Sequence, residues 1–408
     1  MDGRLRQLDG LRGLAALVVV IFHFLSAFAP NFIPDQTDTP YVLADTPFGI
    51  FFNGPFSVSI FFVLSGFVVS NAAAKRRSPI YLNLVLRYVR LAVPVLFSVI
   101  FAWMLLELMP TATLSLDAIM PHTWLNWTYQ GDIPSLFAAI RHGILTVFIR
   151  GNSNFNNVLW TMQIELLGSF ALYLIYGSML GWLCTATLLI LGLACCTGFF
   201  TVAYLGFVLG ALIRDAWTEG RVAPAPSLLV VAGVLLGFSA HGFAQRMGLG
   251  WLPSILTPGE NNSILPPVAA ALIMAGLLYS RIGKIFERGP FQFLGRISFP
   301  LYLVHVPIIY TVFATLYVDF LPGRLGLALL FLFFLSVVSV VALLFEILFD
   351  APTLRLIANV REKYWMRSGK IVGLCDRISD RARSRFGEHS KTSRVGQQRR
   401  LRSGNGTK

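Results

Sequence analysis

Residues 8–24 of the chain read LDGLRGLAALVVVIFHF, a charged turn followed by an apolar run that contains one histidine. Asp9 and Arg12 stand at the start of this stretch, and His23 stands near its end. The eleven residues from Arg12 to His23 correspond to about 16 Å along an α-helix. Because the hydrocarbon core of a bilayer is about 30 Å thick, a membrane-spanning helix that begins at Asp9 places His23 near the middle of the membrane.

A histidine at that depth needs a polar environment, because burying an imidazolium without a partner is costly. One interpretation is a structural histidine that bonds to its own helix, and the other is a residue of a functional site inside a helical bundle. Asp9 has a simpler explanation, since a carboxylate at a helix N-terminus caps the first amides and suits the helix dipole. Its predicted ion pair with Arg12 is equally ordinary, so the rest of the chain has to decide.

The composition excludes a water-soluble domain. Hydrophobic residues make up 55% of the 408 positions and charged residues only 13%, with a mean hydropathy of +0.68. Soluble domains carry about a quarter charged residues. Apolar runs recur almost to the end of the chain, so the sequence predicts an all-α, polytopic membrane bundle in which any chemistry takes place among the helices.

Ten apolar runs, two of them short, are predicted as membrane spans. They cover residues 11–29, 51–70, 81–109, 158–176, 182–197, 199–213, 227–240, 264–279, 297–318 and 325–349, and a short amphipathic piece is expected at 133–149. An even number of spans puts both termini on one side of the membrane, and Lys and Arg are concentrated on that side. We therefore expect a multi-pass protein of the inner cell membrane with cytoplasmic termini.

The polar C-terminal tail carries most of the net charge of +13. From residue 353 to residue 408 there are fifteen Lys and Arg against four Asp and Glu. Basic residues beside membrane helices are typical of cytoplasmic retention and of contact with anionic lipid, so membrane lipid is expected as a partner and nucleic acid is not. The four cysteines show no metal-ligand spacing, so no metal is expected. We predict a transmembrane domain at 1–352 and a basic, disordered cytoplasmic tail at 353–408.

Two arginines stand at helical spacing in the motif RYVR, residues 87–90. Arg87 and Arg90 therefore lie on one face of the third predicted span, at its cytoplasmic end. One interpretation is topological anchoring by positive charge. The other is a phosphate site, because paired guanidinium groups bind phosphate oxygens bidentately. In the second predicted span, the motif FFVLSGF contains Ser65 and Gly66, a small pair for which close helix packing is the favoured role.

Two further predicted spans carry polar residues. The motif WTMQIELLGSF contains Trp160 and Glu165, and a carboxylate within an apolar span usually faces the interior of the bundle. The motif SFPLYLVHVPI contains Tyr302 and His305, and His305 is expected at a depth similar to that of His23. Each ionisable residue alone has a structural explanation. Together, His23, Glu165 and His305 indicate a polar site open to both faces of the membrane.

The motifs LDGLRGLAALVVVIFHF, FFVLSGF, RYVR, NNVLWTMQIE and SFPLYLVH, in that order, give a chain that resembles the acyltransferase 3 family of membrane acyltransferases. The resemblance covers about residues 5–350 and excludes the tail. It implies transfer of an acyl group, often acetyl, from cytoplasmic acyl-CoA to a hydroxyl of a cell-surface or secreted glycan. The expected substrates are therefore acyl-CoA, most simply acetyl-CoA, and an extracytoplasmic glycan or another hydroxyl acceptor.

The resemblance also implies roles for particular residues. His23 is expected as the catalytic histidine, with Glu165 and His305 as further residues of the catalytic core. Arg87 and Arg90 are expected to contact the phosphates of acyl-CoA. The supporting positions are Asp9, Arg12, Ser65, Trp160 and Tyr302.

The chain departs from the family pattern in two places. Family members often continue the Glu motif with an aromatic residue and Tyr, where this chain has Leu-Gly-Ser at 167–169. They often end the last span with Glu-x-Pro, where this chain has Asp-Ala-Pro at 350–352. We expect neither departure to touch the chemistry, although the first bears on packing around the acceptor.

The residues allow two mechanisms for His23. As a neutral imidazole it can deprotonate the acceptor hydroxyl as a general base, or it can take the acyl group itself and pass it on. Glu165 is expected to orient either His23 or an acceptor hydroxyl, and Tyr302 or His305 to stabilise the oxyanion. The rival function is a transporter of a polar solute or proton through the same groups, although the sequence shows no inverted repeat. A non-catalytic scaffold that uses the basic tail would leave the buried histidines unexplained.

Overall fold

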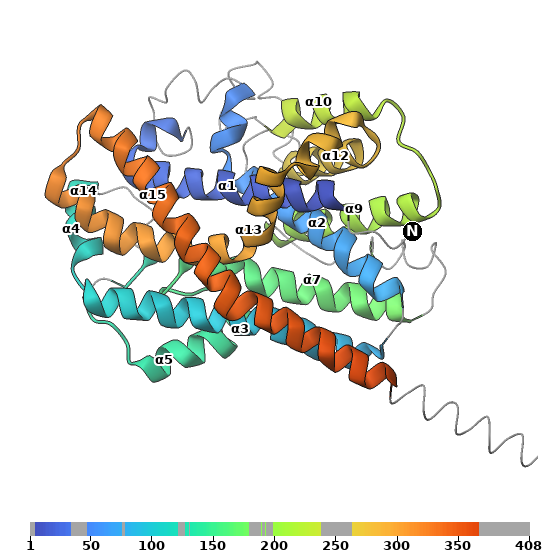
Figure 1. The fold of residues 1–408 in the computed structure, drawn as a ribbon, viewed down its shortest axis with the longest axis horizontal. Coiled ribbons are helices and arrows are strands. Elements are labelled where there is room, and N and C mark those ends of the chain that lie inside the picture. The colour runs from blue at the N-terminus through green and yellow to red at the C-terminus, as the bar shows by residue number, and fades with distance from the viewer. Residues whose placement is uncertain are drawn as a thin grey trace, which may run out of the picture. The chain divides into compact units, whose positions relative to one another are not determined.

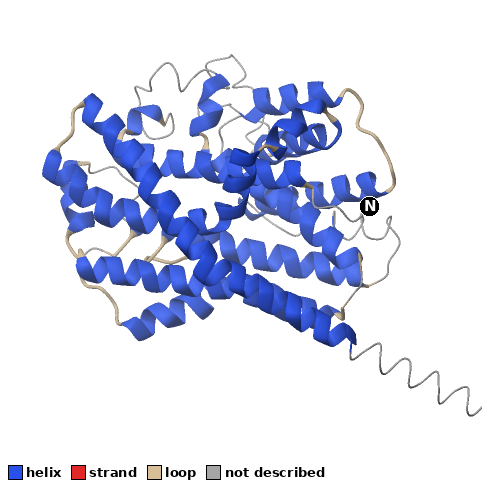
Figure 2. Cartoon of the chain, in the orientation of Figure 1, coloured by secondary structure: helices blue, strands red, loops and turns tan. Residues whose placement is uncertain are grey.

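The computed structural model describes residues 5–33, 47–75, 78–120, 127–129, 131–178, 189, 192, 199–237 and 263–366. Throughout these residues the regular secondary structure is helical, as the sequence predicted (Figure 2). The chain divides into two units, Met1–Leu354 and Arg355–Lys408. In the second unit residues 355–366 are helical, and the rest of the predicted disordered tail lies outside the described residues.

The helices of the first unit can be followed by colour in Figure 1. They are α1 (Arg6–Phe28), α2 (Gly54–Ala74), α3 (Ile80–Leu108), α4 (Ala112–Ile119), α5 (Leu136–Arg141), α6 (Val147–Arg150), α7 (Trp160–Gly177), α9 (Phe199–Thr218), α10 (Pro226–Gly237), α12 (Leu265–Tyr279), α13 (Gly289–Ile308), α14 (Ala314–Phe320) and α15 (Arg324–Phe345). The π-helical turns are η6 (His142–Thr146), η10 (Ile309–Phe313) and η11 (Glu346–Asp350). The 3₁₀ helices are η1 (Pro30–Phe32), η4 (Pro47–Phe52), η7 (Asn157–Leu159) and η9 (Arg281–Glu287).

Six described helical stretches are long and apolar enough to cross a membrane. They are Arg6–Phe28, Gly54–Ala74, Ile80–Leu108, Asn157–Gly177, Gly289–Phe320 and Arg324–Met366. A seventh is obtained when α12 and η9, which are bent by 91° relative to each other, are taken as one broken span. The protein is therefore a multi-pass integral membrane protein.

Several of the ten predicted spans differ from the described helices. The run at 227–240 corresponds to α10, which is described from Pro226 to Gly237, and residues 238–240 lie outside the described residues. The helix predicted at 297–318 begins instead at Gly289, so Arg296 lies inside it. The last helical stretch passes through Pro352 and continues to Met366 rather than ending at 349. The run predicted at 182–197 lies almost wholly outside the described residues.

A glycine contact brings α1 and α13 together, and the two helices pack along much of their length. A Cβ added to Gly13 would lie 2.6 Å from the backbone carbonyl carbon of Leu294, so the two backbones meet where only glycine fits. This close packing sets Arg12 of α1 beside Ser298 of α13. It therefore determines which side chains of the two helices face each other.

The polar residue Asn156 compensates for a proline inside α13. Pro307 has no backbone N–H, so the carbonyl of Leu303 lacks the donor that a helix normally supplies four residues later. The side-chain amide of Asn156 donates to that carbonyl over 2.8 Å, and Asn156 itself is fully buried. The contact ties the loop before α7 to the part of α13 that carries His305.

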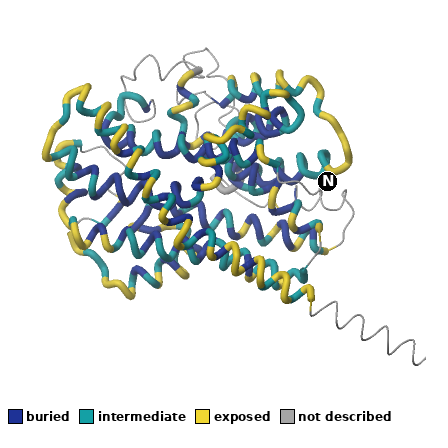
Figure 3. The backbone as a smooth tube through the Cα atoms, viewed as in Figure 1, coloured by how far each residue is buried: buried dark blue, intermediate teal, exposed yellow. Residues whose placement is uncertain are grey.

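Figure 3 shows buried positions along the packed faces of α1, α3, α7 and α13, whereas α15 has many exposed positions. Phe24 of α1 stacks on Phe334 of α15 with ring centroids 5.0 Å apart, which anchors one face of α15 in the core. The opposite face exposes apolar side chains, among them Leu325, Leu329 and Leu332. Such a surface suits contact with lipid tails.

Candidate active site

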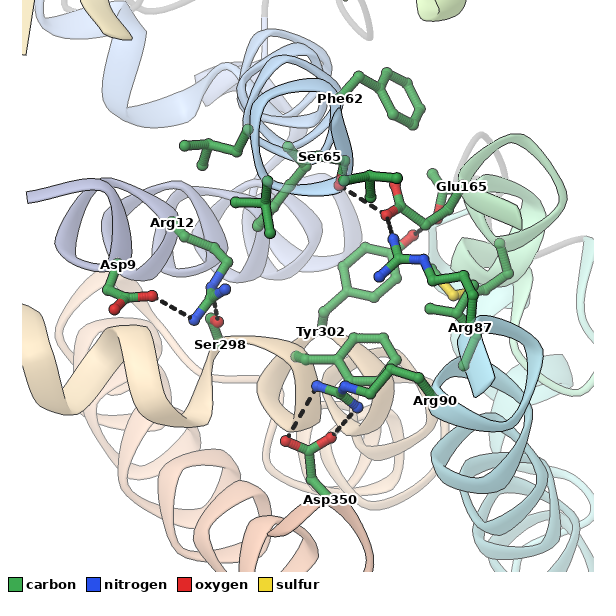
Figure 4. A pocket seen from close by; sticks show the side chains of 18 of the residues that line it. Asp9, Arg12, Phe62, Ser65, Arg87, Arg90, Glu165, Ser298, Tyr302 and Asp350 are labelled. Atoms are coloured by element: carbon green, nitrogen blue, oxygen red, sulfur yellow. Dashed lines mark hydrogen bonds and ion pairs between the residues drawn. The ribbon is translucent and has the colours of Figure 1, made fainter. Parts of the chain in front are cut away.

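A cavity of about 560 Å³ lies among α1, α2, α3, α7, α13 and η11. Figure 4 shows polar side chains that converge on it from these elements. Its charged lining consists of Arg12, Arg87, Arg90, Arg296, Asp9, Glu165, Glu346 and Asp350. The rest of the wall is mainly apolar and includes Phe61, Phe62, Leu64 and Met162. The described lining is formally neutral and suits a ligand with charged and apolar parts.

Arg87 connects several of the sequence motifs. Its guanidinium group forms an ion pair with the carboxylate of Glu165, and its Nε donates to the hydroxyl of Ser169 over 2.9 Å. Ser65 donates to the same carboxylate oxygen over 2.7 Å. The side chains of Arg87 and Glu165 are only 18% and 12% exposed, so solvent screens their attraction weakly. The motifs of α2, α3 and α7 thus meet at one point.

Arg90, one helical turn after Arg87, is paired with Asp350 of η11. Its Nη1 donates to Oδ1 over 2.5 Å and its Nη2 donates to Oδ2 over 3.4 Å. The guanidinium carbon lies 5.0 Å from the ring centroid of Phe299. Asp350 and Ser169 belong to the two places where the chain departs from the family pattern. Both departures contact the arginine pair, Ser169 through Arg87 and Asp350 through Arg90.

Arg12 lines the same cavity from α1. Its Nη2 donates to Asp9 Oδ1 and to the carbonyl of Gly295, each over 3.0 Å, and its Nε donates to Ser298 Oγ over 3.0 Å. The local ion pair with Asp9 that the sequence predicted is present. Arg12 additionally links α1 to α13 at the cavity wall.

Tyr302 lines the cavity and also contacts His305, with ring centroids 5.9 Å apart. Its hydroxyl donates to the carbonyl of Val158 and lies 2.7 Å from the hydroxyl of Thr161. Because a phenol has one hydrogen, Tyr302 donates to Val158 and accepts from Thr161. The hydrogen needed for the expected oxyanion role is therefore already directed at a backbone carbonyl.

His23 and His305 face each other across the contact between α1 and α13. His305 Nε2 lies 3.1 Å from His23 Nδ1. The Nδ1 atoms of His23 and His305 also lie 2.9 Å and 3.0 Å from the carbonyls of Val19 and Leu301, respectively. Because a carbonyl only accepts hydrogen bonds, both Nδ1 atoms carry the hydrogen in the neutral rings. The single Nδ1 hydrogen of His23 is then shared between the carbonyl of Val19 and His305 Nε2, and the Nε2 of His23 carries a lone pair.

The predicted residues thus form two adjoining groups. Asp9, Arg12, Ser65, Arg87, Arg90, Glu165 and Tyr302 line the cavity. The described lining does not include His23 or His305; His305 contacts the ring of Tyr302, and His23 contacts His305. Glu165 lies with the arginines, so its position favours a role toward Arg87. Trp160 supports the wall through an edge contact with Phe62, at a centroid distance of 6.5 Å.

Glu346 and Asp350 line the cavity but were not predicted as site residues. Glu346 binds Arg296 over 2.7 Å, and Asp350 binds Arg90. Both acids lie at the end of the last long apolar run, so the signal that singled out Glu165 applies to them as well. Thr161, which bonds to Tyr302, gave no comparable signal because threonine is common in helices that pack closely.

A family model described as an acyltransferase domain matches residues 5–347, which include the histidine pair and the cavity lining except Asp350 and Leu354. This chain belongs to the acyltransferase 3 family. It is therefore a membrane-bound acyltransferase, an enzyme that transfers an acyl group from a donor to an acceptor. Comparison of this acyltransferase with curated proteins and with solved structures gives no significant match.

Proposed function

We propose that this acyltransferase moves an acyl group, most simply acetyl, from cytoplasmic acyl-CoA to a hydroxyl of an extracytoplasmic sugar or glycan. The main support is that Tyr302 lines the arginine-lined cavity and also contacts His305 of the histidine pair. Lys and Arg are concentrated in the segments expected inside, which supports the inner cell membrane as the location and cytoplasmic termini.

Arg87 and Arg90 suit the phosphates of acyl-CoA. They project from consecutive turns of α3 into the cavity, and a guanidinium fork binds phosphate oxygens bidentately. The pantetheine arm and acyl group are less polar and suit the apolar wall. Phe61 continues that wall to Tyr302, with ring centroids 6.3 Å apart. A heavily phosphorylated coenzyme does not enter lipid, so a donor site at the cytoplasmic end of α3 is accessible to it.

His23 supplies the base in the simpler of two mechanisms. Its Nε2 lone pair accepts the hydrogen of the acceptor hydroxyl while the hydroxyl oxygen attacks the thioester carbon. The carbon–sulfur bond breaks, the acceptor carries the new ester, and the thiolate of coenzyme A takes the proton from His23. In the second mechanism, Nε2 attacks the thioester carbon and displaces the thiolate of coenzyme A, which gives an acyl-imidazolium on His23. The acceptor hydroxyl then attacks the acyl carbon, its proton goes to the thiolate, and the bond between the acyl carbon and Nε2 breaks. Both need the tautomer that the bond to Val19 selects.

His305 acts through His23 in this proposal. Its Nε2 accepts the Nδ1 hydrogen of His23, which orients the catalytic ring and stabilises the positive charge that forms on it. The hydrogen of neutral His305 is directed at the carbonyl of Leu301, so the ring has no second N–H for an oxyanion. We therefore assign His305 a positioning role, and Glu165 a role in holding Arg87.

The donor thioester has to pass Tyr302 to reach His23. Tyr302 lines the described cavity and its ring contacts His305, whereas neither histidine lines the cavity. We infer that the ring moves when the donor binds, a gating step of a kind common in enzymes. In this proposal the acceptor approaches from the outer face, and its determinants lie in residues 31–48, 110–157 and 241–262, which the predicted topology puts outside.

The experiment that tests this function uses membranes containing the protein and acetyl-CoA labelled in its acetyl group. We expect label on a glycan or on the protein itself, whereas a transporter that uses the same groups would leave no transferred label. Mass spectrometry of surface glycans from cells with and without the protein then identifies the acceptor. Absence of transferred label from membranes in which the protein binds coenzyme A would contradict the proposed function.

A further inference from the structure

Every arginine in the described lining of the cavity already has a carboxylate partner. The pairs are Arg12–Asp9, Arg87–Glu165, Arg90–Asp350 and Arg296–Glu346. A phosphate that enters the cavity therefore has to displace a bound carboxylate or share its arginine. Carboxylates and phosphates both bind guanidinium bidentately, so the two kinds of anion compete for the same donors.

Glu165 and Asp350, the partners of the two proposed phosphate contacts, differ in how they are held. Glu165 accepts from Ser65 as well as from Arg87, so it keeps a hydrogen bond if Arg87 turns to a phosphate. Within the described part of the chain, the hydrogen bonds of the Asp350 side chain go to Arg90 alone. Asp350 is also the last residue of the π-helical turn η11, a geometry found frequently at functional sites. Asp350 is therefore the carboxylate that loses all of its described hydrogen bonds when its arginine turns to a phosphate, so it competes for its arginine more strongly than Glu165 does.

The attraction between Arg90 and Asp350 is strong because the pair is largely shielded from water. The side chains are 21% and 7% exposed, so water screens their attraction much less than at an open surface. Taking away one member of such a pair leaves the other as an uncompensated charge. An Arg90 without Asp350 would therefore attract any anion that reaches the cavity.

We propose that Asp350 is an internal competitor for the phosphates of the donor and thereby determines the specificity of the cavity for a polyphosphorylated donor. The inference rests on the proposed function, in which acyl-CoA docks at Arg87 and Arg90. An anion with a single phosphate gains little by replacing Asp350, because one counter-ion is exchanged for another. A diphosphate engages both arginines together and offsets the lost contact. After transfer, the return of Asp350 to Arg90 promotes release of coenzyme A.

The test compares the wild-type full-length protein with Asp350→Asn, each in lipid nanodiscs. The binding constants of coenzyme A, inorganic pyrophosphate and inorganic phosphate are measured by calorimetry. Asp350→Asn should lower the Kd of coenzyme A at least about tenfold. This factor corresponds to about 1.4 kcal/mol of binding free energy that the wild type uses to separate Asp350 from Arg90. Phosphate should gain by a larger factor than coenzyme A. With acetyl-CoA as substrate, KM and kcat should both fall, because coenzyme A leaves slowly.

Asp215→Asn is the matched control. Asp215 also pairs with an arginine, Arg214, over 2.8 Å and is 18% exposed, but it does not line the described cavity. The substitution Asp215→Asn removes the same charge as Asp350→Asn, but at a position that does not line the described cavity. It should therefore leave the affinity for coenzyme A at the wild-type value. Unchanged or weaker coenzyme A binding by folded Asp350→Asn would overturn the inference while leaving the donor assignment intact. Absence of coenzyme A binding by the wild type would overturn both.

A measurement on the wild type covers the case in which Asp350→Asn does not fold. Carboxylates are labelled with a carbodiimide and a small amine, with and without saturating coenzyme A, and the sites are quantified by mass spectrometry. Coenzyme A should increase the labelling of Asp350 relative to that of Glu165, because Asp350 is released from its arginine. Labelling of Asp350 that does not rise would overturn the inference.

Discussion

His305 Nε2 lies 3.1 Å from His23 Nδ1, and each ring is also held by a carbonyl one turn earlier in its own helix. These bonds order the hydrogens: the Nδ1 hydrogen of His23 is shared by the carbonyl of Val19 and His305 Nε2, and that of His305 points to the carbonyl of Leu301. The Nε2 of His23 is thereby left with the lone pair. The arrangement depends on the close contact of α1 with α13, where Gly13 lets the two backbones meet.

Replacing His305 should reduce acyl transfer without abolishing it, because the base itself stays in place. His305→Phe removes one of the two acceptors of the Nδ1 hydrogen of His23 and leaves the carbonyl of Val19, so it should lower kcat/KM by about 2- to 13-fold, the effect of losing a hydrogen bond worth about 0.5–1.5 kcal/mol. His305→Gln keeps a side-chain oxygen that can accept this hydrogen and should recover part of the loss. The measurement is the initial rate of labelled acetyl transfer at equal amounts of folded protein. Equal rates for the two variants would contradict the positioning role.

Tyr302→Phe tests whether the hydroxyl of Tyr302 takes part in the chemistry. The substitution keeps the ring but removes the hydrogen bonds to Val158 and Thr161. The free energy of unfolding should fall by about 1–2 kcal/mol, and kcat should stay close to the wild-type value, because no reacting atom loses a partner. Unfolding curves and initial rates check the two expectations. A loss of about 100-fold in kcat would instead identify the hydroxyl as an oxyanion donor.

Arg87→Ala should have two effects that a second substitution separates. Alone, it weakens coenzyme A binding and leaves Glu165 as a largely buried carboxylate without its guanidinium partner, at a cost of about 3–5 kcal/mol in stability. Adding Glu165→Gln removes the uncompensated charge, so stability should largely return while the affinity for coenzyme A stays low. Thermal unfolding and coenzyme A binding are measured on the same preparations. Recovery of both properties together would contradict a phosphate contact at Arg87.

Arg87→Ala combined with Arg90→Ala should weaken acyl-CoA binding more than either substitution alone. Arg214→Ala is the control, because Arg214 is paired with an acid but does not line the described cavity. Binding of a non-transferable acyl-CoA analogue measures the effect without turnover. Acyl-CoA affinity that is unchanged in the double variant would return both arginines to the role of topological anchors.

Asn156 and Pro307 should be energetically coupled. Asn156→Ala removes the donor to the carbonyl of Leu303 and should lower the free energy of unfolding by about 1–3 kcal/mol. Pro307→Ala supplies a backbone N–H that can bond to the same carbonyl, so Asn156→Ala should cost less in that background. A double-mutant cycle of unfolding in detergent measures the coupling. Additive effects would show that the missing N–H is not what Asn156 compensates.

Much of the fold could be predicted because the bilayer requires backbone groups to be satisfied within long apolar helices. α1, α2, α3 and α7 begin and end within a few residues of the predicted runs. The start of α13 was missed because residues 289–296 are polar enough to look like a loop, yet this segment forms the first turns of the helix and carries Arg296. α10 begins within one residue of its predicted run, and the predicted end at 238–240 lies outside the described residues.

The site could be predicted in its residue types but not in its pairings. The search for ionisable residues within apolar runs identified His23, Glu165 and His305. The similar depth predicted for the two histidines agrees with their contact in the structure. Which acid meets which arginine depends on how α3 lies against α7 and η11, a long-range arrangement that one sequence does not specify. Asp350 was treated as a departure from the family pattern, although its place in an apolar run carried the same signal as Glu165.

Acetyl transfer by the His23→Ala variant tests the catalytic role of His23 most directly. Wild-type and variant proteins are incorporated into membranes in equal amounts and incubated with acetyl-labelled acetyl-CoA, and coenzyme A binding is measured in parallel. We predict that His23→Ala binds coenzyme A as the wild type does and transfers no label to an acceptor or to itself. Label transfer by His23→Ala at the wild-type rate would contradict a catalytic imidazole at this position.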